Sequence, residues 1–140
     1  MDYEFLPHTA DAKFQAFGKR LDLAFANAAY AMTDIITNHR KVRRRVKRYI
    51  SIKSESRESL LYDFLEKFIF LLDTDGFLLR KLNHMKLTET DKGFKLVAFA
   101  FGDNQPERYE SETTIKAVTY QEMFVKKKDD RWIVQVVVDI

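Results

Sequence analysis

The chain contains no cysteine, and its 140 residues include only four glycines and two prolines. The absence of cysteine excludes disulfide bonds, thiolate zinc sites and cysteine nucleophiles. With so few glycines, a phosphate-binding loop built from glycine-rich backbone is not expected. No apolar run reaches the roughly 18 residues that a membrane-spanning helix needs, so we expect no contact with a membrane.

The composition that remains is typical of a well-packed domain. Hydrophobic residues make up 46% of the chain and aromatic residues 14%, which argues against disorder. A chain of this length buries roughly two-thirds of its unfolded surface, enough for one core. We therefore expect a single domain over residues 1–140. The acidic residues 1–4 lack the basic segment of a secretory signal, so the sequence predicts a cytoplasmic protein.

The first predicted helix covers residues 22–37. It follows a predicted strand at residues 12–17, where apolar and polar side chains alternate, and Gly18 separates the two elements. Within the helix the apolar residues recur at the spacing of one helical face, and many are alanines that allow close packing on a sheet. Asp22 is the expected N-cap, because its carboxylate can accept from free backbone N–H groups.

The second predicted helix begins at Ser56 or Ser59 and ends near Leu72. Its apolar residues form a stripe that extends almost around the helix, so we expect it to be the most buried helix of the domain. The segment 73–76, which closes with a glycine, should end this helix.

Strand patterns dominate the rest of the chain. Apolar alternation predicts strands over residues 42–53, 82–90, 94–101, 113–125 and 132–138. Residues 91–93 should connect two of them as a hairpin. The order of the elements predicts an α+β fold in which two helices pack on a mostly antiparallel β-sheet.

A short segment concentrates the positive charge of the chain. Between residues 40 and 48 there are seven basic side chains and no acidic one, although the net charge of the whole chain is only +3. The remainder carries 17 basic and 21 acidic side chains, so this segment alone makes the chain basic. The pattern predicts either a solvated edge strand protected against pairing, or a contact with RNA or an acidic partner. The seven residues are Arg40, Lys41, Arg43, Arg44, Arg45, Lys47 and Arg48.

The chain carries no motif of a self-sufficient enzyme. His8, His39 and His84 share no metal-ligand spacing, and each is interpreted as structural. A nucleophile elbow and a zinc-protease motif are also missing. A metal-dependent hydrolase would need more metal ligands than the sequence shows, and it would also need a general base, which is not evident. We therefore do not expect an enzyme.

The C-terminal segment offers oxygen ligands at fixed positions. Residues 133–138 form a largely apolar strand, and Asp139 and Ile140 follow it directly. A packed strand would hold the Asp139 carboxylate and the terminal carboxylate in place. Such hard oxygen ligands select Mg²⁺, Ca²⁺ or Mn²⁺, whereas the alternative is an ordinary solvated aspartate.

Three segments together resemble the archease family. They are His8-Thr9-Ala10-Asp11 near the start, the segment 115–120, and Val138-Asp139-Ile140. Residues 60–65 fit the same pattern, and the resemblance covers essentially the whole chain in order. The resemblance implies a protein cofactor of the RtcB-type RNA ligase in tRNA splicing. Such a cofactor promotes guanylylation of the ligase's active-site histidine by GTP and allows repeated turnover.

The resemblance also implies a binding site for a divalent metal ion. The family's ligand positions fall on Asp11, Asp139 and Ile140, of which Ile140 would contribute a main-chain carbonyl or terminal carboxylate oxygen. Calcium is the ion most expected in a crystal, and magnesium and manganese are the alternatives. The lysine of the late motif falls on Lys116, whose cation should contact a phosphate or offset the carboxylates.

Two positions depart from the family's pattern. Gln121 stands where many relatives have histidine, and Tyr109 lies in a loop where another histidine is common. These departures put a role of those histidines in doubt, but they do not touch the expected ligands. Two rival functions remain beside the ligase cofactor, namely an RNA-binding module acting through residues 40–48 and a general chaperone.

Overall fold

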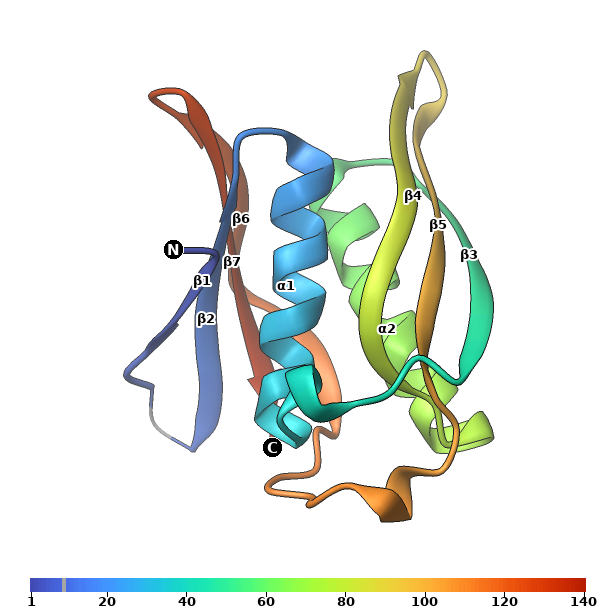
Figure 1. Ribbon diagram of the computed structural model, residues 1–140. Helices are drawn as coiled ribbons and strands as arrows, with labels where there is room; N and C mark the ends of the chain where they lie inside the picture. The colour runs from blue at the N-terminus through green and yellow to red at the C-terminus, as the bar shows by residue number, and fades with distance from the viewer. Residues whose placement is uncertain (9) are drawn as a thin grey trace.

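Figure 1 shows a computed structural model that describes residues 1–8 and 10–140, in which each helix is preceded and followed by strands and residues 78–139 are formed mainly by strands. The helices are α1 (Leu21–Ile36) and α2 (Arg57–Asp75), and short 3₁₀ turns cover His39–Lys41 and Pro106–Arg108. The strands are β1 (Tyr3–Leu6), β2 (Asp11–Gly18), β3 (Val46–Ser54), β4 (Leu78–Thr90), β5 (Gly93–Asp103), β6 (Ala117–Lys128) and β7 (Arg131–Asp139).

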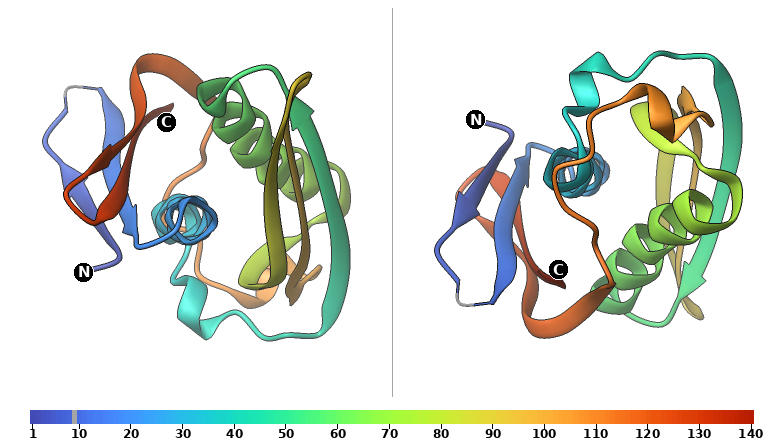
Figure 2. Two further views of the ribbon diagram at one scale, coloured as in Figure 1. Left: turned by 90° about the horizontal axis from the view of Figure 1, so that it is seen from above. Right: turned by 90° about the horizontal axis from the view of Figure 1, so that it is seen from below.

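The strands form two separate sheets in which every pairing is antiparallel. One sheet has the order β1-β2-β7-β6, and the other has the order β3-β5-β4. Figures 1 and 2 show α1 in the space between the sheets, with α2 beside it. The predicted α+β class is confirmed. The division into two sheets was not predicted, because alternation shows which residues face a core but not which strands pair.

Helix α1 contacts both sheets. The Asn27 side-chain amide donates to the Phe17 carbonyl of β2 at 2.8 Å, and the Tyr30 hydroxyl accepts from the Leu82 N–H of β4 at 2.9 Å. Nine of its 16 residues are buried, against seven of 19 in α2. The expectation that α2 would be the most buried helix was therefore wrong, because the small alanines of α1 let a sheet approach from either side.

The ends of the helices differ in how well the sequence predicted them. Arg20, not Asp22, is the N-cap of α1 and makes no side-chain capping bond, whereas Asp22 lies in the first turn and accepts from the Leu23 N–H. In α2 the Ser56 side chain accepts from the Ser59 N–H at 3.0 Å in a capping box. Gly76 caps α2 at φ 67°, in the left-handed region that favours glycine, as predicted, but the helix runs on to Asp75 instead of ending near Leu72.

The basic segment forms a strand over only part of its predicted length. Residues 39–41 make a 3₁₀ turn and β3 begins at Val46, so the prediction of a strand from residue 42 was wrong. The intervening backbone is bound elsewhere, since the Arg43 N–H donates to the Tyr109 hydroxyl and the Arg45 N–H to the Gly102 carbonyl. Strand β3 does lie at a sheet edge, as predicted.

Two further features complete the fold. Strand β1, a four-residue strand at the other end of the chain, was not predicted. The hairpin at residues 91–93 is confirmed, because β4 and β5 pair up to Thr90 and Gly93. In the part of the chain that the structure describes, no helix has the length and apolar character needed to cross a membrane.

Two phenylalanines of α2 provide a test of this packing. Phe64 is fully buried, whereas Phe70 is 54% exposed. Phe64→Ala should lower the free energy of unfolding by about 3–5 kcal/mol, because it removes a buried ring and leaves a cavity. Phe70→Ala should change it by about 0.5 kcal/mol or less. Urea unfolding followed by circular dichroism measures both values, and equal losses would contradict the described orientation of α2.

Candidate functional site

The register of β2 and β7 places the two predicted aspartate ligands side by side. The pairing runs from Asp11 opposite Asp139 to Gly18 opposite Trp132. Directly opposed residues of an antiparallel pair share one face, with their Cβ atoms about 4.5–5.5 Å apart. The structure therefore brings together two carboxylates from opposite ends of the sequence. Their mutual repulsion is unfavourable unless a positive group lies beside them.

Strand β7 holds Asp139 in a fixed position. It is an inner strand, paired with β2 on one side and β6 on the other. The side chains of Val134, Val136 and Val138 are fully buried in the core. Asp139 and Ile140 follow this anchored stretch at the surface, and Ile140 is 40% exposed. The last residues of the chain are therefore held at a defined place on the rim of the sheet.

The start of β6 places Lys116 at the same rim. Its backbone N–H donates to the Asp139 carbonyl at 2.8 Å, and the next residue, Ala117, pairs directly with Asp139. The Lys116 side chain is exposed. Seen from below, the C-terminus lies close to the segment that leads into β6 (Figure 2, right). Lys116 is thus a neighbour of Asp139 through the backbone, and the role of its side chain stays a prediction.

The histidine that precedes Asp11 joins this group. The His8 ring contacts the Asp11 carboxylate through Nδ1, and its Nε2 lies 2.7 Å from Glu122 Oε2. Lys13 Nζ donates to Glu122 Oε1 at 3.1 Å. Hydrogen bonds to Glu122 and Asp11 raise the pKa of His8, and the same bond to His8, with that to Lys13, lowers the pKa of Glu122.

Glu122 was missed by the sequence analysis. It reaches His8 because β6 is irregular between Thr119 and Phe124, where the strand has more residues than its partner β7. Glu122 adopts φ 55° there, and its carbonyl accepts from the Gln135 side chain at 2.7 Å. An insertion of this kind redirects side chains. The local sequence pattern gives no signal of this insertion.

The other histidines pack elsewhere. His39 is buried and its ring stands edge-on to Tyr30 of α1, with ring centroids 4.9 Å apart. His84 is exposed on β4, where its ring stands edge-on to Phe99 at 6.2 Å. Within the described residues, the three histidines therefore form no cluster.

The donor atoms offered by Asp11, Asp139 and Ile140 are oxygens, the type of ligand that hard divalent cations prefer. In residues 1–8 and 10–140, no three or more His, Cys, Asp or Glu side chains are grouped so as to hold a metal ion. Two carboxylates and a main-chain oxygen of Ile140 make a different donor set, which consists of the oxygen atoms that Ca²⁺, Mg²⁺ and Mn²⁺ prefer. Since these ions take six or more ligands, this rim would leave positions for water or for a partner's oxygens.

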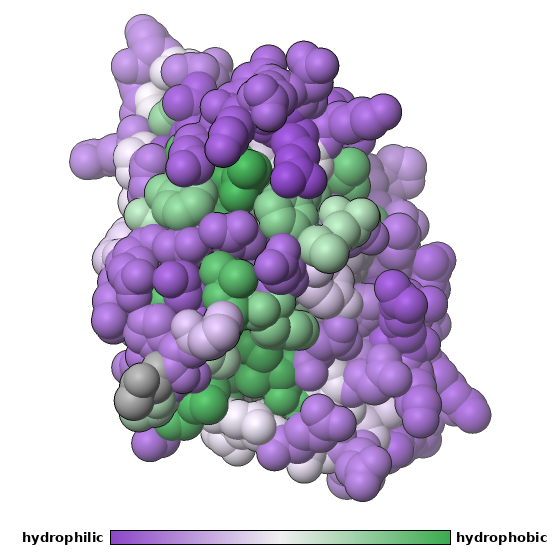
Figure 3. Space-filling view, turned by 90° about the vertical axis from the view of Figure 1, so that its left-hand side faces the viewer, coloured by the Kyte–Doolittle hydropathy of each residue, from purple (hydrophilic) through white to green (hydrophobic). Residues whose placement is uncertain are grey.

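The surface beside this rim is partly apolar. Figure 3 shows the side of the molecule formed by the four-stranded sheet, where hydrophobic side chains make a band bordered by hydrophilic ones. Phe5 of β1 is 49% exposed. Exposed apolar bands of this kind are typical of surfaces that bind other proteins.

Comparison with known proteins decides the family. The model of the archease protein family (MTH1598/TM1083) matches residues 3–140. The chain belongs to the archease family. It is 39% identical over 140 residues to the protein archease of Pyrococcus abyssi, covering 99% of this chain and 98% of the relative. It is 40% identical over 139 residues to that of Methanosarcina barkeri, covering 99% and 95%.

Solved structures agree with this assignment. The solution structure of Methanobacterium thermoautotrophicum protein 1598 has a TM-score of 0.87 at 37% identity, covering 99% of this chain and 98% of that one. A crystal structure from Thermotoga maritima, described as an archease and possible chaperone, has a TM-score of 0.60 at 18% identity, covering 96% and 94%. The second likeness shows a shared fold.

The two departures from the archease pattern have distinct surroundings. The Tyr109 hydroxyl donates to the buried Asp103 carboxylate at 2.6 Å and accepts from the Arg43 N–H at 3.0 Å. Tyr109 therefore ties the loop after β5 to the basic segment. Gln121 is exposed within the irregular part of β6, and its N–H donates to the Thr119 hydroxyl at 3.3 Å.

The contact between His8 and Glu122 predicts a pH-dependent stabilisation. Because the pKa of His8 is raised in the folded protein, its contribution is full below about pH 6.5, the ordinary histidine value, and is lost as the pH rises through the raised pKa. Glu122→Gln should move the pKa of His8 down towards its ordinary value. An NMR titration of the ring protons measures this shift, with Glu107→Gln as the control. An unchanged pKa in the Glu122 variant would contradict the contact.

Proposed function

We propose that this chain is a protein cofactor, not an enzyme, that activates an RtcB-type GTP-dependent RNA ligase in tRNA splicing. In this proposal it promotes guanylylation of the ligase histidine by GTP and allows multiple turnover. Membership of the archease family over nearly the whole chain supports it. The observation that carries it is the direct pairing of Asp11 with Asp139 at the end of the anchored strand β7.

A divalent cation held by Asp11, Asp139 and Ile140 is part of this proposal. We expect calcium in a crystal, with magnesium or manganese as the alternatives. When bound, such an ion would supply charge neutralisation for the phosphates of a nucleotide. The chain's own contribution is to keep its oxygen atoms in fixed positions, since β7 is paired on both sides. Lys116 adds a positive charge at the same rim, where it can meet a phosphate.

The exposed location of this rim suits work on a partner protein. Asp139, Ile140 and Lys116 are exposed at the end of the sheet, so they can enter the active site of another molecule, whereas Asp11 beside them is partly covered by His8. Positioning and charge neutralisation are the main needs of nucleotidyl transfer. The apolar band beside the rim offers surface for the ligase to bind (Figure 3). A cytoplasmic location stays a prediction from the sequence.

The basic segment is available for a further contact with tRNA or an acidic ligase surface. Arg48 is bound to Asp75, with guanidinium and carboxylate atoms 2.6 Å apart, and is less exposed than its neighbours. Electrostatic attraction by such a segment would mainly accelerate association. The exposed members are Arg40, Lys41, Arg43, Arg44, Arg45 and Lys47.

A general chaperone is the second candidate function. The apolar band favours it, because chaperones bind apolar segments of unfolded clients. The two candidates differ in their dependence on the rim. A chaperone acting through the band would suppress aggregation of unrelated proteins whether or not Asp11 and Asp139 are intact.

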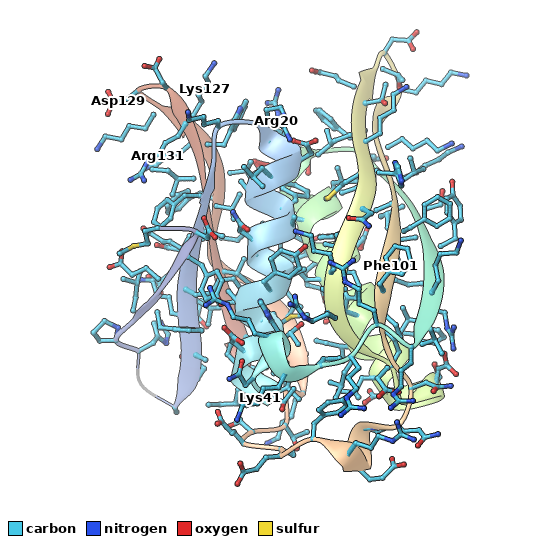
Figure 4. The ribbon with its side chains drawn as sticks, in the orientation of Figure 1. Arg20, Lys41, Phe101, Lys127, Asp129 and Arg131 are labelled. Atoms are coloured by element: carbon cyan, nitrogen blue, oxygen red, sulfur yellow. The ribbon has the colours of Figure 1, made fainter. Side chains whose placement is uncertain are left out.

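Replacing one aspartate of the rim tests the proposed function. Asp139→Asn removes a negative charge at an exposed position at the end of β7. Because the side chain keeps its size, the fold should persist. Stimulation of ligase guanylylation under multiple-turnover conditions should be abolished. Binding of Ca²⁺, measured by titration calorimetry, should be lost with it. Asp129→Asn is the matched control, since Asp129 lies in the β6–β7 hairpin at the opposite end of the sheet (Figure 4). Full stimulation by the Asp139 variant would overturn the proposal.

A C-terminal extension tests which oxygen of Ile140 takes part. Adding a short Gly-Ser segment after Ile140 converts the terminal carboxylate into a peptide carbonyl. If the carboxylate is the ligand, the extension should impair stimulation almost as much as Asp139→Asn does. If the carbonyl is the ligand, the loss should be mild. The same guanylylation assay measures it, with an identical segment added before Met1 as the control.

A further inference from the structure

The three-stranded sheet has an outer face that is turned away from both helices. In Figures 1 and 2, β3, β5 and β4 form one side of the molecule, with α1 and α2 on their inner side. Along β5 the inward residues Leu96, Ala98 and Ala100 are buried in the core. The residues between them therefore point outward, because side chains alternate across a strand.

The outward positions form what we name the lysine–aromatic face. The pairing of the strands identifies these positions, because directly paired residues lie on the same face of the sheet. Lys47 and Lys81 both pair with the outward Phe101, and Lys86 pairs with the outward Val97. None of the stretches 47–53, 81–88 and 95–101 contains an aspartate or glutamate. The face comprises Lys47, Tyr49, Lys53, Lys81, Lys86, Lys95, Phe99 and Phe101.

Aromatic rings at the centre of this face are accessible. Tyr49 is 59% exposed, and its ring centroid lies 5.5 Å from that of Phe99. Phe101, on the next outward position of β5, is partly exposed and lies on this side of the molecule in Figure 4. Rings of this kind offer flat apolar surfaces on which other planar groups can stack.

The lysines surround these rings without acidic partners. The Lys47 ammonium lies 4.9 Å from the Phe99 ring centroid, whereas the Lys81 ammonium lies 5.8 Å from the ring centroid of Tyr30 in α1, on the inner side of the sheet. Among the described residues, no ion pair joins any lysine of the face to a carboxylate. The face is therefore cationic and open, which makes it complementary to a polyanion.

A polyanion with exposed planar groups matches both properties. Single-stranded nucleic acid presents unstacked bases to aromatic side chains and phosphates to lysines. A duplex hides the faces of its bases, and an acidic protein would use the lysines but not the rings. We propose that the lysine–aromatic face binds single-stranded nucleic acid, with bases stacked on Tyr49, Phe99 and Phe101 and with phosphates held by the lysines.

This site is separate from the rim that carries Asp11 and Asp139. The rim belongs to the four-stranded sheet, and the helices lie between that sheet and the one bearing the proposed site. It is also distinct from most of the basic segment, which precedes β3. Variants of one site should therefore leave the other intact.

The test measures fluorescence anisotropy of a labelled single strand of about twelve nucleotides bound by the full chain. Tyr49→Leu and Phe99→Leu keep apolar bulk but remove the stacking rings, and each should weaken binding by about tenfold. Lys53→Gln combined with Lys95→Gln should lower the slope of log affinity against log salt by about 0.7 for each lost phosphate contact. RNA and DNA of the same sequence are compared. Binding of either one that is weakened by the ring variants supports the site.

Matched variants elsewhere control for charge and aromatic content. Phe70→Leu alters an exposed ring of α2, and Lys127→Gln combined with Lys128→Gln alters the far hairpin (Figure 4). Both should bind like the unaltered chain. Urea unfolding shows whether each variant stays folded. If the Tyr49 or Phe99 variant does not fold, Phe101→Leu is tested in its place.

Three outcomes would overturn the proposal. Equal binding of duplex and single strand would show attraction by charge alone. Unchanged affinity of the folded Tyr49 and Phe99 variants would exclude stacking. Loss of binding only when Arg43, Arg44 and Arg45 are replaced by glutamine would assign the nucleic acid to the basic segment. Binding that survives Asp139→Asn is expected, because this proposal does not depend on the metal site.

Discussion

The pairing of β7 with β2 and β6 is the constraint on which the rest of this structure depends. It joins the last strand of the chain to one of the first, and its buried valines belong to the core into which α1 packs. Backbone hydrogen bonds on both sides hold the strand up to Asp139. As a result, Asp139 and Ile140 occupy a defined place beside Asp11. A terminal segment is otherwise among the least ordered parts of a domain.

The same strand explains why two negative charges that face each other are tolerated. Two aspartates directly across a ladder repel each other, yet the core side of β7 contributes enough apolar burial to keep the register. A shift by one residue would exchange the core-facing Val134, Val136 and Val138 for the residues between them, and would bring the polar amide of Gln135 into the core. His8 reaches the Asp11 carboxylate from the same end, and Glu122 binds the other side of its ring. Charge compensation is therefore local to the rim.

Helix α1 organises the molecule on a larger scale. Its alanines let both sheets approach, and its hydrogen bonds from Asn27 and to Tyr30 fix one sheet on each side. This arrangement separates two surfaces of opposite character. The rim with the aspartates lies on the four-stranded sheet, and the lysine–aromatic face lies on the three-stranded sheet, turned away from the helices. One small domain thus presents an anionic site and a cationic one without mutual neutralisation.

The sequence by itself determined both helices, most of the strands and which residue types are available at the rim. Alternation in residues 12–17, the capping serines of α2 and the hairpin at residues 91–93 are local signals, and the structure bears them out. Family resemblance pointed to Asp11, Asp139, Ile140 and Lys116 before any coordinates. The caps, the alternation and the hairpin follow from short-range spacing, which a sequence records directly, whereas the residues of the rim were implied by the resemblance alone.

Only the tertiary structure decided which distant segments meet. The division of the strands into two sheets, the insertion in β6 that brings Glu122 to His8, and the short extent of β3 all depend on long-range partners. Periodicity states that a residue faces a core, but not which strand lies beside it. The energy that selects one pairing comes from packing of the whole domain, and no single segment contains it.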